Sequence, residues 1–132
     1  MADTIILGPG EGRSYAMGRL QASFKVDAAA EGRSYVLSEW WCDPGFTGVG
    51  AHLHEANDEV FYVIEGRAEI LVGDTWHILE RGGFVRIPAG VTHDFRNSGT
   101  MRCGLLNVYV PGGFESAMPG IVAWFADHPD GA

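Results

Sequence analysis

Four side chains able to bind a metal ion stand out in this 132-residue chain: His52, His54, Glu59 and His93. Residues two apart on a strand point to the same face, about 7 Å apart, so His52 and His54 could turn both imidazoles toward one ion. Glu59 begins the apolar run EVFYVIEG, and His93 opens a further candidate strand. The histidine pair alone would fit an exposed polar face equally well, so the spacing of the whole set carries the prediction. Three imidazoles and a carboxylate suit one divalent ion per chain, namely Fe, Ni, Mn, Cu or Zn.

The elements that must position these residues have the pattern of short β-strands. Turn signals recur about every 8–12 residues, which is typical of an all-β sandwich or barrel. The clearest hairpin is AEILVGDTWHIL, where Gly73 and Asp74 form a two-residue turn. After Pro111 the pattern changes, and we expect a short helix at 120–127 followed by loose final residues. The predicted strands are 20–26, 34–42, 51–54, 59–64, 67–72, 75–80, 84–87, 93–96 and 101–110.

Two segments resemble the two sequence motifs of the cupin family. Residues 45–66, GFTGVGAHLHEANDEVFYVIEG, match the first motif at both histidines, at Glu59 and at Gly66, whereas Phe46 stands where that motif opens with glycine. Residues 82–97, GGFVRIPAGVTHDFRN, match the second motif throughout. Its matching positions are Gly82, Pro88, Gly90, His93 and Asn97.

The resemblance implies a single cupin domain over residues 1–132, with the first motif at 45–66 and the second at 82–97. It implies a cupin-type double-stranded β-helix, a jelly-roll barrel of six strands, with a mononuclear metal site at its centre. The family's usual ligands correspond here to His52, His54, Glu59 and His93. The glycine, proline and asparagine of the second motif are expected to be structural, because they suit a tight turn at the end of a strand.

Strand alternation predicts what surrounds the metal. If Glu59 points inward, so do Phe61 and Val63, and if His93 points inward, so does Phe95. An apolar pocket of this kind suits a small uncharged or aromatic ligand, although plain core packing is an alternative role for each wall residue. Glu39 and Asn107 lie on strands that could bring a second polar group to the site. The residues expected to line the pocket are Phe61, Val63, Phe95, Tyr109 and Trp40.

The chain as a whole, including PGGFE after the last strand, is similar to single-domain relatives of quercetin 2,3-dioxygenase. That resemblance implies metal-dependent O2 chemistry on a small aromatic or enol substrate, with Glu59 as both ligand and catalytic base. Two alternatives stay open: a non-oxidative metal-dependent isomerase, lyase or decarboxylase, and a cupin that binds a small ligand without turnover. The fold does not choose among them.

The composition argues against several classes of partner. The net charge is −8, the pI is near 4.9 and Lys25 is the sole lysine, so neither nucleic acid nor an anionic membrane surface is an expected partner. No apolar run approaches the ~18–20 residues of a spanning helix and no secretory signal is visible, which predicts a cytoplasmic protein. Cys42 and Cys103 are expected to be free and buried. Apolar strand edges, together with the family resemblance, predict a homodimer.

Overall fold

The computed structural model describes residues 4–26 and 34–132. Over these residues the chain forms nine strands, one 3-10 helical turn and one α-helix. The strands are β1 (Arg13–Met17), β2 (Leu20–Val26), β3 (Val36–Cys42), β4 (Asp58–Glu65), β5 (Arg67–Val72), β6 (Thr75–Glu80), β7 (Phe84–Ile87), β8 (His93–Arg96) and β9 (Cys103–Val110), and the helical segments are η2 (Phe114–Ala117) and α1 (Met118–Asp127).

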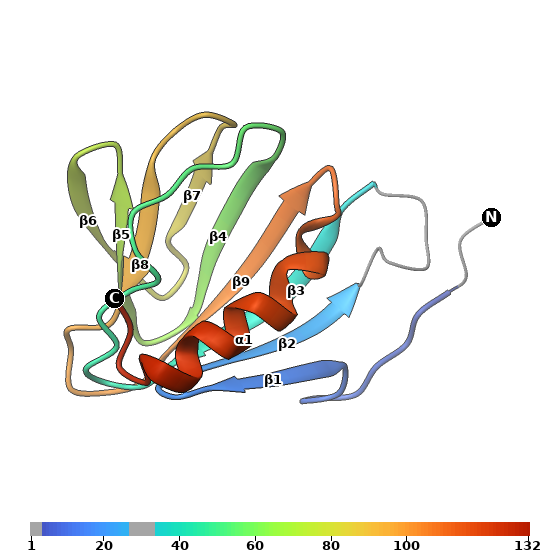
Figure 1. Cartoon of the computed structure of the whole chain (residues 1–132), viewed down its shortest axis with the longest axis horizontal. Helices are drawn as coiled ribbons and strands as arrows, with labels where there is room; N and C mark the ends of the chain where they lie inside the picture. The colour runs from blue at the N-terminus through green and yellow to red at the C-terminus, as the bar shows by residue number, and fades with distance from the viewer. Residues whose placement is uncertain (1–3, 27–33) are drawn as a thin grey trace.

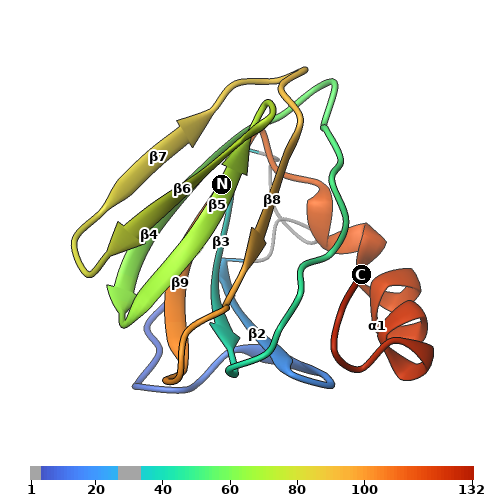
Figure 2. The same ribbon diagram turned by 90° about the vertical axis from the view of Figure 1, so that its left-hand side faces the viewer.

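These strands form two antiparallel sheets. The larger sheet has the order β1-β2-β3-β9-β4-β7, and the smaller one has the order β6-β5-β8. Figure 1 shows the larger sheet fanning out from the smaller one, and Figure 2 shows both curving around a common interior. The predicted all-β jelly-roll fold is confirmed, with sheets of six and three strands. Cys42 and Cys103 lie opposite each other in β3 and β9, free and buried as predicted.

The inner wall of the larger sheet follows from strand alternation. In β3, Ser38 and Trp40 are buried, while the residues on either side of them in the sequence are only half-buried or lie on the outer face. Residues in register on neighbouring strands share a face of the sheet. Asn107 in β9 is in register with Ser38 in β3 and with Phe61 in β4. Three strands therefore turn one row of side chains into the interior.

Most predicted strands are confirmed to within two residues at either end. The strand expected at 51–54 is wrong, because this segment makes only an isolated bridge between His52 and His93. Gly48 and Gly50 precede it with φ values of 114° and 97°, and this conformation interrupts an extended ladder. Alternation does not predict β1, because only Met17 of its five residues is buried.

The C-terminal segment forms a longer helix than expected. α1 begins two residues before the predicted helix at 120–127, with Pro119 in its first turn, where a missing N–H costs no hydrogen bond. Figure 1 shows α1 lying across the larger sheet. Neither helical segment in the described part of the chain is long and apolar enough to cross a membrane.

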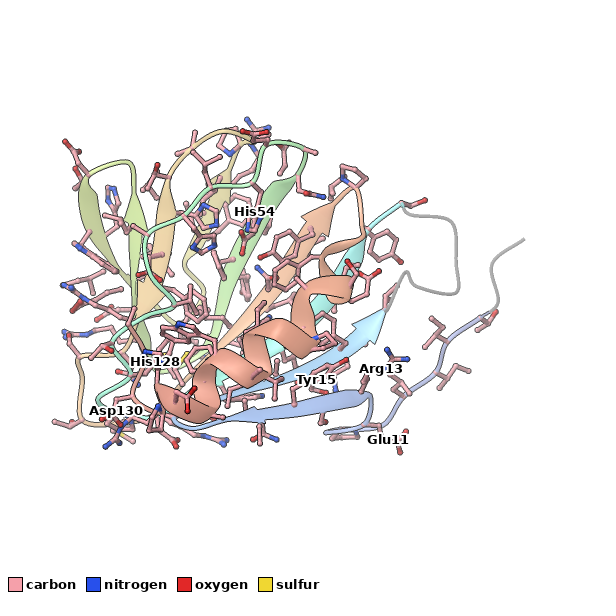
Figure 3. All side chains as sticks on the ribbon, viewed as in Figure 1. Glu11, Arg13, Tyr15, His54, His128 and Asp130 are labelled. Carbon is pink, nitrogen blue, oxygen red and sulfur yellow. The ribbon has the colours of Figure 1, made fainter. Side chains whose placement is uncertain are left out.

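The prediction that the final residues are loose is wrong. The Asp130 carboxylate accepts a hydrogen bond from Arg19 Nε at 2.6 Å, and the Asp130 carbonyl accepts one from the Thr47 N–H at 2.8 Å. Figure 3 shows Asp130 near the C-terminal end of α1. A side chain from one loop and a backbone group from another thus hold the tail, a long-range arrangement that the polar sequence HPDGA does not reveal.

Candidate metal centre

The backbone brings the two motif segments together. The N–H of His52 donates to the His93 carbonyl at 3.0 Å, and the N–H of His93 donates to the His52 carbonyl at 2.7 Å. The N–H of Gly90 donates to the His54 carbonyl at 2.8 Å. Gly90 has a φ of 86°, which favours glycine. Figure 3 places His54 in the interior between the two sheets.

Asp94 fixes the loop that carries His52. One oxygen of its buried carboxylate accepts hydrogen bonds from the backbone N–H groups of Val49 at 3.0 Å and Phe95 at 2.8 Å. A Cβ on Gly48 would lie 2.6 Å from the other oxygen, so only glycine allows this approach. Burial raises the pKa of Asp94, although these backbone donors oppose the rise. The Asp94 carboxylate therefore ties the irregular segment before His52 to β8.

The three imidazoles converge on one point. The ring centroids lie 5.0 Å apart for His52 and His54, 4.4 Å for His52 and His93, and 5.2 Å for His54 and His93. One ring nitrogen from each lies within 4.8 Å of the other two. The grouping predicted from the sequence is therefore present in the fold, and the histidines are near enough together to share one ion.

Local hydrogen bonds orient two of the rings. Nδ1 of His52 lies 2.6 Å from the Gly50 carbonyl, and Nδ1 of His93 lies 3.0 Å from the Val91 carbonyl. A carbonyl only accepts, so each Nδ1 carries the proton when the ring is neutral. That tautomer leaves the lone pair on Nε2, the arrangement usual for metal-bound histidine.

Glu59 lies beside the histidines and is only 3% exposed. Its Oε2 lies 2.7 Å from His93 Nε2 and 3.5 Å from His54 Nε2. Glu59 Oε2 and His93 Nε2 are nevertheless buried without a hydrogen-bond partner of proper geometry among the described residues. A cation bound by both atoms would satisfy them together. The donors present here therefore fit a divalent ion.

The electrostatics of the cluster favour cation binding. Burial lowers the pKa of His54, and the imidazoles of His52 and His93 add to this effect against the charge of Glu59. Burial also acts downward on His93, but the nearby Glu59 carboxylate raises the pKa of His93 overall. Burial raises the pKa of Tyr109 well above its usual range, and Glu59 adds to the rise. The Tyr109 hydroxyl, 3.4 Å from His54 Nε2, stays protonated at neutral pH.

The cluster opens into a cavity of about 450 Å³ with apolar, largely aromatic walls. Inward residues of the larger sheet form one wall, and α1 forms another. Among the described residues, those that line the cavity include no lysine or arginine. The lining residues are Trp40, Val49, His52, His54, Glu59, Phe61, Phe95, Asn107, Tyr109, Phe114, Ala117, Gly120, Ile121, Trp124 and Phe125.

The residues expected in the pocket divide into two groups. Val63 is fully buried in the core and does not line the cavity. Its N–H and carbonyl pair with Gly83 and Gly82 in the turn before β7, so it lies further along β4 than the cavity extends. The four that do line the cavity are Trp40, Phe61, Phe95 and Tyr109.

The remaining polar candidates are also placed by the structure. Asn107 reaches the site, whereas Glu39 lies on the outer side of β3 with its carboxylate 3.7 Å from Lys25 Nζ. His77 and His128 are exposed. The His128 ring stacks on Trp124 at the end of α1, with ring centroids 4.0 Å apart, where Figure 3 shows it.

Sequence reasoning missed the wall that α1 contributes. The lining residues of η2 and α1 include positions 117, 120, 121, 124 and 125. This is the i, i+3, i+4, i+7, i+8 spacing of a single helical face. Small and apolar residues at that spacing were the available signal, but nothing local shows that the face turns toward a metal site.

Comparison with known proteins gives a family match and several structural likenesses. The family model described as the cupin domain matches residues 40–109, which include both motifs. An uncharacterized protein from Streptomyces coelicolor is 48% identical over 42 residues, which are 32% of this chain and 40% of that protein. The match thus spans less than half of the length of that curated relative.

Three solved structures show the same fold at low sequence identity. KdgF from Halomonas has a TM-score of 0.73 and 15% identity, with 88% of this chain and 99% of that chain covered. An RmlC-like cupin from Shewanella frigidimarina has a TM-score of 0.72 and 18% identity, with 87% of this chain and 96% of that chain covered. The polyketide cyclase RemF from Streptomyces resistomycificus has a TM-score of 0.70 and 20% identity, with 82% of this chain and 80% of that chain covered.

Proposed function

The chain belongs to the cupin family, and from that premise we propose that it is a metal-dependent dioxygenase acting on a small aromatic or enol substrate. The observation that carries the proposal is a cluster of three histidines and Glu59 that opens into an aromatic cavity. Its size suits a compact organic ligand. The absence of basic side chains from the described lining argues against phosphorylated or carboxylated substrates.

The residues that would hold the ion are His52, His54, His93 and Glu59. The ion would supply Lewis-acid and redox chemistry at a substrate oxygen. Glu59 Oε2 would accept the proton of a substrate hydroxyl, which leaves the substrate as an electron-rich enolate or phenolate. The Tyr109 hydroxyl would donate to a substrate oxygen, and the aromatic walls would orient the ring and exclude water. In a dioxygenase both atoms of O2 enter the product, so no external reductant is needed.

One observation favours a second candidate, a non-oxidative isomerase, lyase or decarboxylase. Such an enzyme needs an acid or base besides Glu59, and the Tyr109 hydroxyl is positioned to be one, because it lies beside both His54 and Glu59. Redox-inert Zn would then suffice, since three nitrogens and one oxygen form an ordinary zinc site. In the third candidate function, the protein would bind a small ligand in the same cavity without turnover.

Oxygen uptake separates these candidates. Natively purified protein should be analysed for metal and then assayed against a panel of flavonols and enols, in air and under argon. Dioxygenase function predicts Fe, Ni, Mn or Cu and stoichiometric O2 consumption with at least one substrate. Substrate loss that proceeds equally under argon would contradict it in favour of non-oxidative chemistry, and binding without turnover would favour the third candidate function.

A further inference from the structure

Asn107 is a buried amide that contacts Glu59. It lies on the inner face of β9 and is 1% exposed. Its Nδ2 donates to Glu59 Oε1 at 2.9 Å and to the Val60 carbonyl at 3.3 Å. The first bond occupies one oxygen of the Glu59 carboxylate, whereas the other oxygen, Oε2, is directed at His93 and His54.

The carbonyl oxygen of the Asn107 amide, Oδ1, is buried and lacks a hydrogen-bond donor among the described residues. Asn97, equally buried, shows what a structural asparagine looks like in this fold: Nδ2 donates to two carbonyls, those of Cys42 and Met101, and Oδ1 accepts from the Gly99 N–H. An amide kept in the core with its carbonyl unpaired is unfavourable, so packing alone does not explain Asn107.

The hydrogen bond from Asn107 restricts the orientation of the Glu59 carboxylate. The terminal torsion of a glutamate side chain has a broad energy profile, so an unrestrained Glu59 carboxylate could turn either oxygen, or neither, toward the histidines. A donor fixed by the sheet removes that freedom at Oε1.

We propose that Asn107 is a positioning residue that sets the metal affinity of the site by holding Oε1 of Glu59, so that Oε2 faces the ion. The proposal rests on the proposed metal centre and acts only through Glu59. Partners that orient ligands in this way typically change metal affinity about 10- to 100-fold.

The test is a competitive Co²⁺ titration with a chromophoric chelator. Asn107→Leu keeps nearly the same size but removes the donor, and it should weaken Co²⁺ binding about 10-fold or more and alter the visible Co²⁺ spectrum. Ser38→Ala is the matched control, because Ser38 is buried in register with Asn107 and its hydroxyl accepts from Trp40 Nε1 instead of making a hydrogen bond to Glu59 among the described residues. Its affinity should stay within about 2-fold of wild type, since no ligand-orienting bond is lost.

A double-mutant cycle shows whether the effect passes through Glu59. In the Glu59→Ala background, where the acceptor for Asn107 Nδ2 is gone, Asn107→Leu should change Co²⁺ affinity by less than about 3-fold. Wild-type affinity in Asn107→Leu, or an equal loss in both backgrounds, would overturn the positioning role. Should Asn107→Leu fail to fold, Asn107→Ala must show the same loss and the same dependence on Glu59. A wild-type protein that takes up no Co²⁺ would instead refute the metal centre itself, and with it this role.

Discussion

Glu59 has two separable roles at the scale of single residues. As a ligand it supplies charge and geometry, and as a base it must also take a proton from the substrate. A carboxylate bound to a metal ion must leave the ion, or share it, before it can accept a proton from the substrate. A substitution that keeps the shape but removes the charge distinguishes these roles.

Glu59→Gln should retain its metal when metal is saturating, because three imidazoles still hold the ion. Its turnover should fall about 100- to 10,000-fold, the usual contribution of a general base. Metal analysis checks the retained metal. Steady-state kinetics on the substrate found in the oxygen-uptake screen checks the loss of turnover. A variant with full metal and near wild-type turnover would show that Glu59 is not the base.

The residues of this site differ in how far the sequence reveals them. Spacing identified the three histidines and Glu59, because the motifs hold these residues at fixed intervals. Asn107 was only one of two candidates, since its face and its partner depend on how β9 pairs with β4. Val63 was misplaced, because alternation gives the face of a strand but not how far along that strand a cavity extends.

At the scale of elements, α1 shapes the mouth of the cavity. Ala117 and Gly120 are exposed and sit on the cavity-lining side, and a Cβ built on Gly120 would meet nothing within 4 Å. Glycine inside a helix costs about 0.5–1 kcal/mol relative to alanine, and here no close backbone contact requires it. The space beside Gly120 is therefore available to a ligand.

Gly120→Leu should close part of that space. We expect affinity for 3-hydroxyflavone to fall about 10-fold or more, since a branched side chain would occupy ligand volume, while metal content stays unchanged. Fluorescence titration measures the affinity, and Ala123→Leu on the exposed side of the same helix is the control. Equal affinities for the two variants would show that this end of α1 does not border the ligand.

An ion pair between Glu69 and Arg96 joins β5 to β8 and makes a pH-dependent contribution to the free energy of unfolding. The Ser98 hydroxyl donates to one oxygen of Glu69, and Arg96 Nε donates to the other at 2.5 Å. These contacts, Ser98 first and then Arg96, hold the pKa of Glu69 below its ordinary value. The ionised form is thus stabilised by folding. Its contribution is present above the unfolded pKa of about 4.3 and is lost as the pH falls through the lower folded value.

Glu69→Gln should therefore lower the free energy of unfolding by about 1 kcal/mol at pH 7, and by clearly less as the pH drops below about 4. Urea unfolding of both proteins at the two pH values measures the difference. Glu65→Gln is the control, because the Glu65–Arg102 pair is about half exposed on both sides and such pairs contribute little. A penalty for Glu69→Gln that does not change with pH would contradict this account.

Strands and helices can be predicted from the local sequence pattern better than the way in which they pack together. The pattern of β-rich segments between turn signals located eight strands, but it missed β1, whose residues are mostly exposed. It also predicted a strand at 51–54, where glycines at positive φ leave a single bridge. The docking of α1 and of the C-terminal tail depends on contacts between residues about 80 or more positions apart in sequence, such as Thr47 with Asp130, and no local signal encodes those.

At the scale of the whole molecule, the outer face of the larger sheet carries a cluster of apolar side chains, with Glu39 and Arg86 beside it. Val108 is in register with Val60, and Leu106 is in register with Tyr62, which in turn faces Phe84. Tyr62 is 41% exposed and Phe84 is 60% exposed. Contiguous apolar surface of this kind is typical of a protein interface. We propose that two copies of the chain pair through this face.

Light scattering should then give twice the 14.3 kDa mass of one chain at micromolar concentration. Phe84→Glu should give the monomer mass, because a buried unpaired charge opposes association, and its metal content should equal that of wild type. A wild-type monomer at micromolar concentration would rule out the dimer. A Phe84→Glu dimer would place the interface elsewhere.

The measurement that tests the central claim most directly is the metal content of natively purified protein beside that of the His52→Ala, His54→Ala double variant. We expect one divalent ion per wild-type chain and a metal affinity at least about 10-fold lower in the variant, because losing two ligands should cost no less than the 10- to 100-fold typical of losing a residue that orients a ligand. Circular dichroism should show that both proteins are folded. Full metal occupancy in the double variant would contradict the assignment.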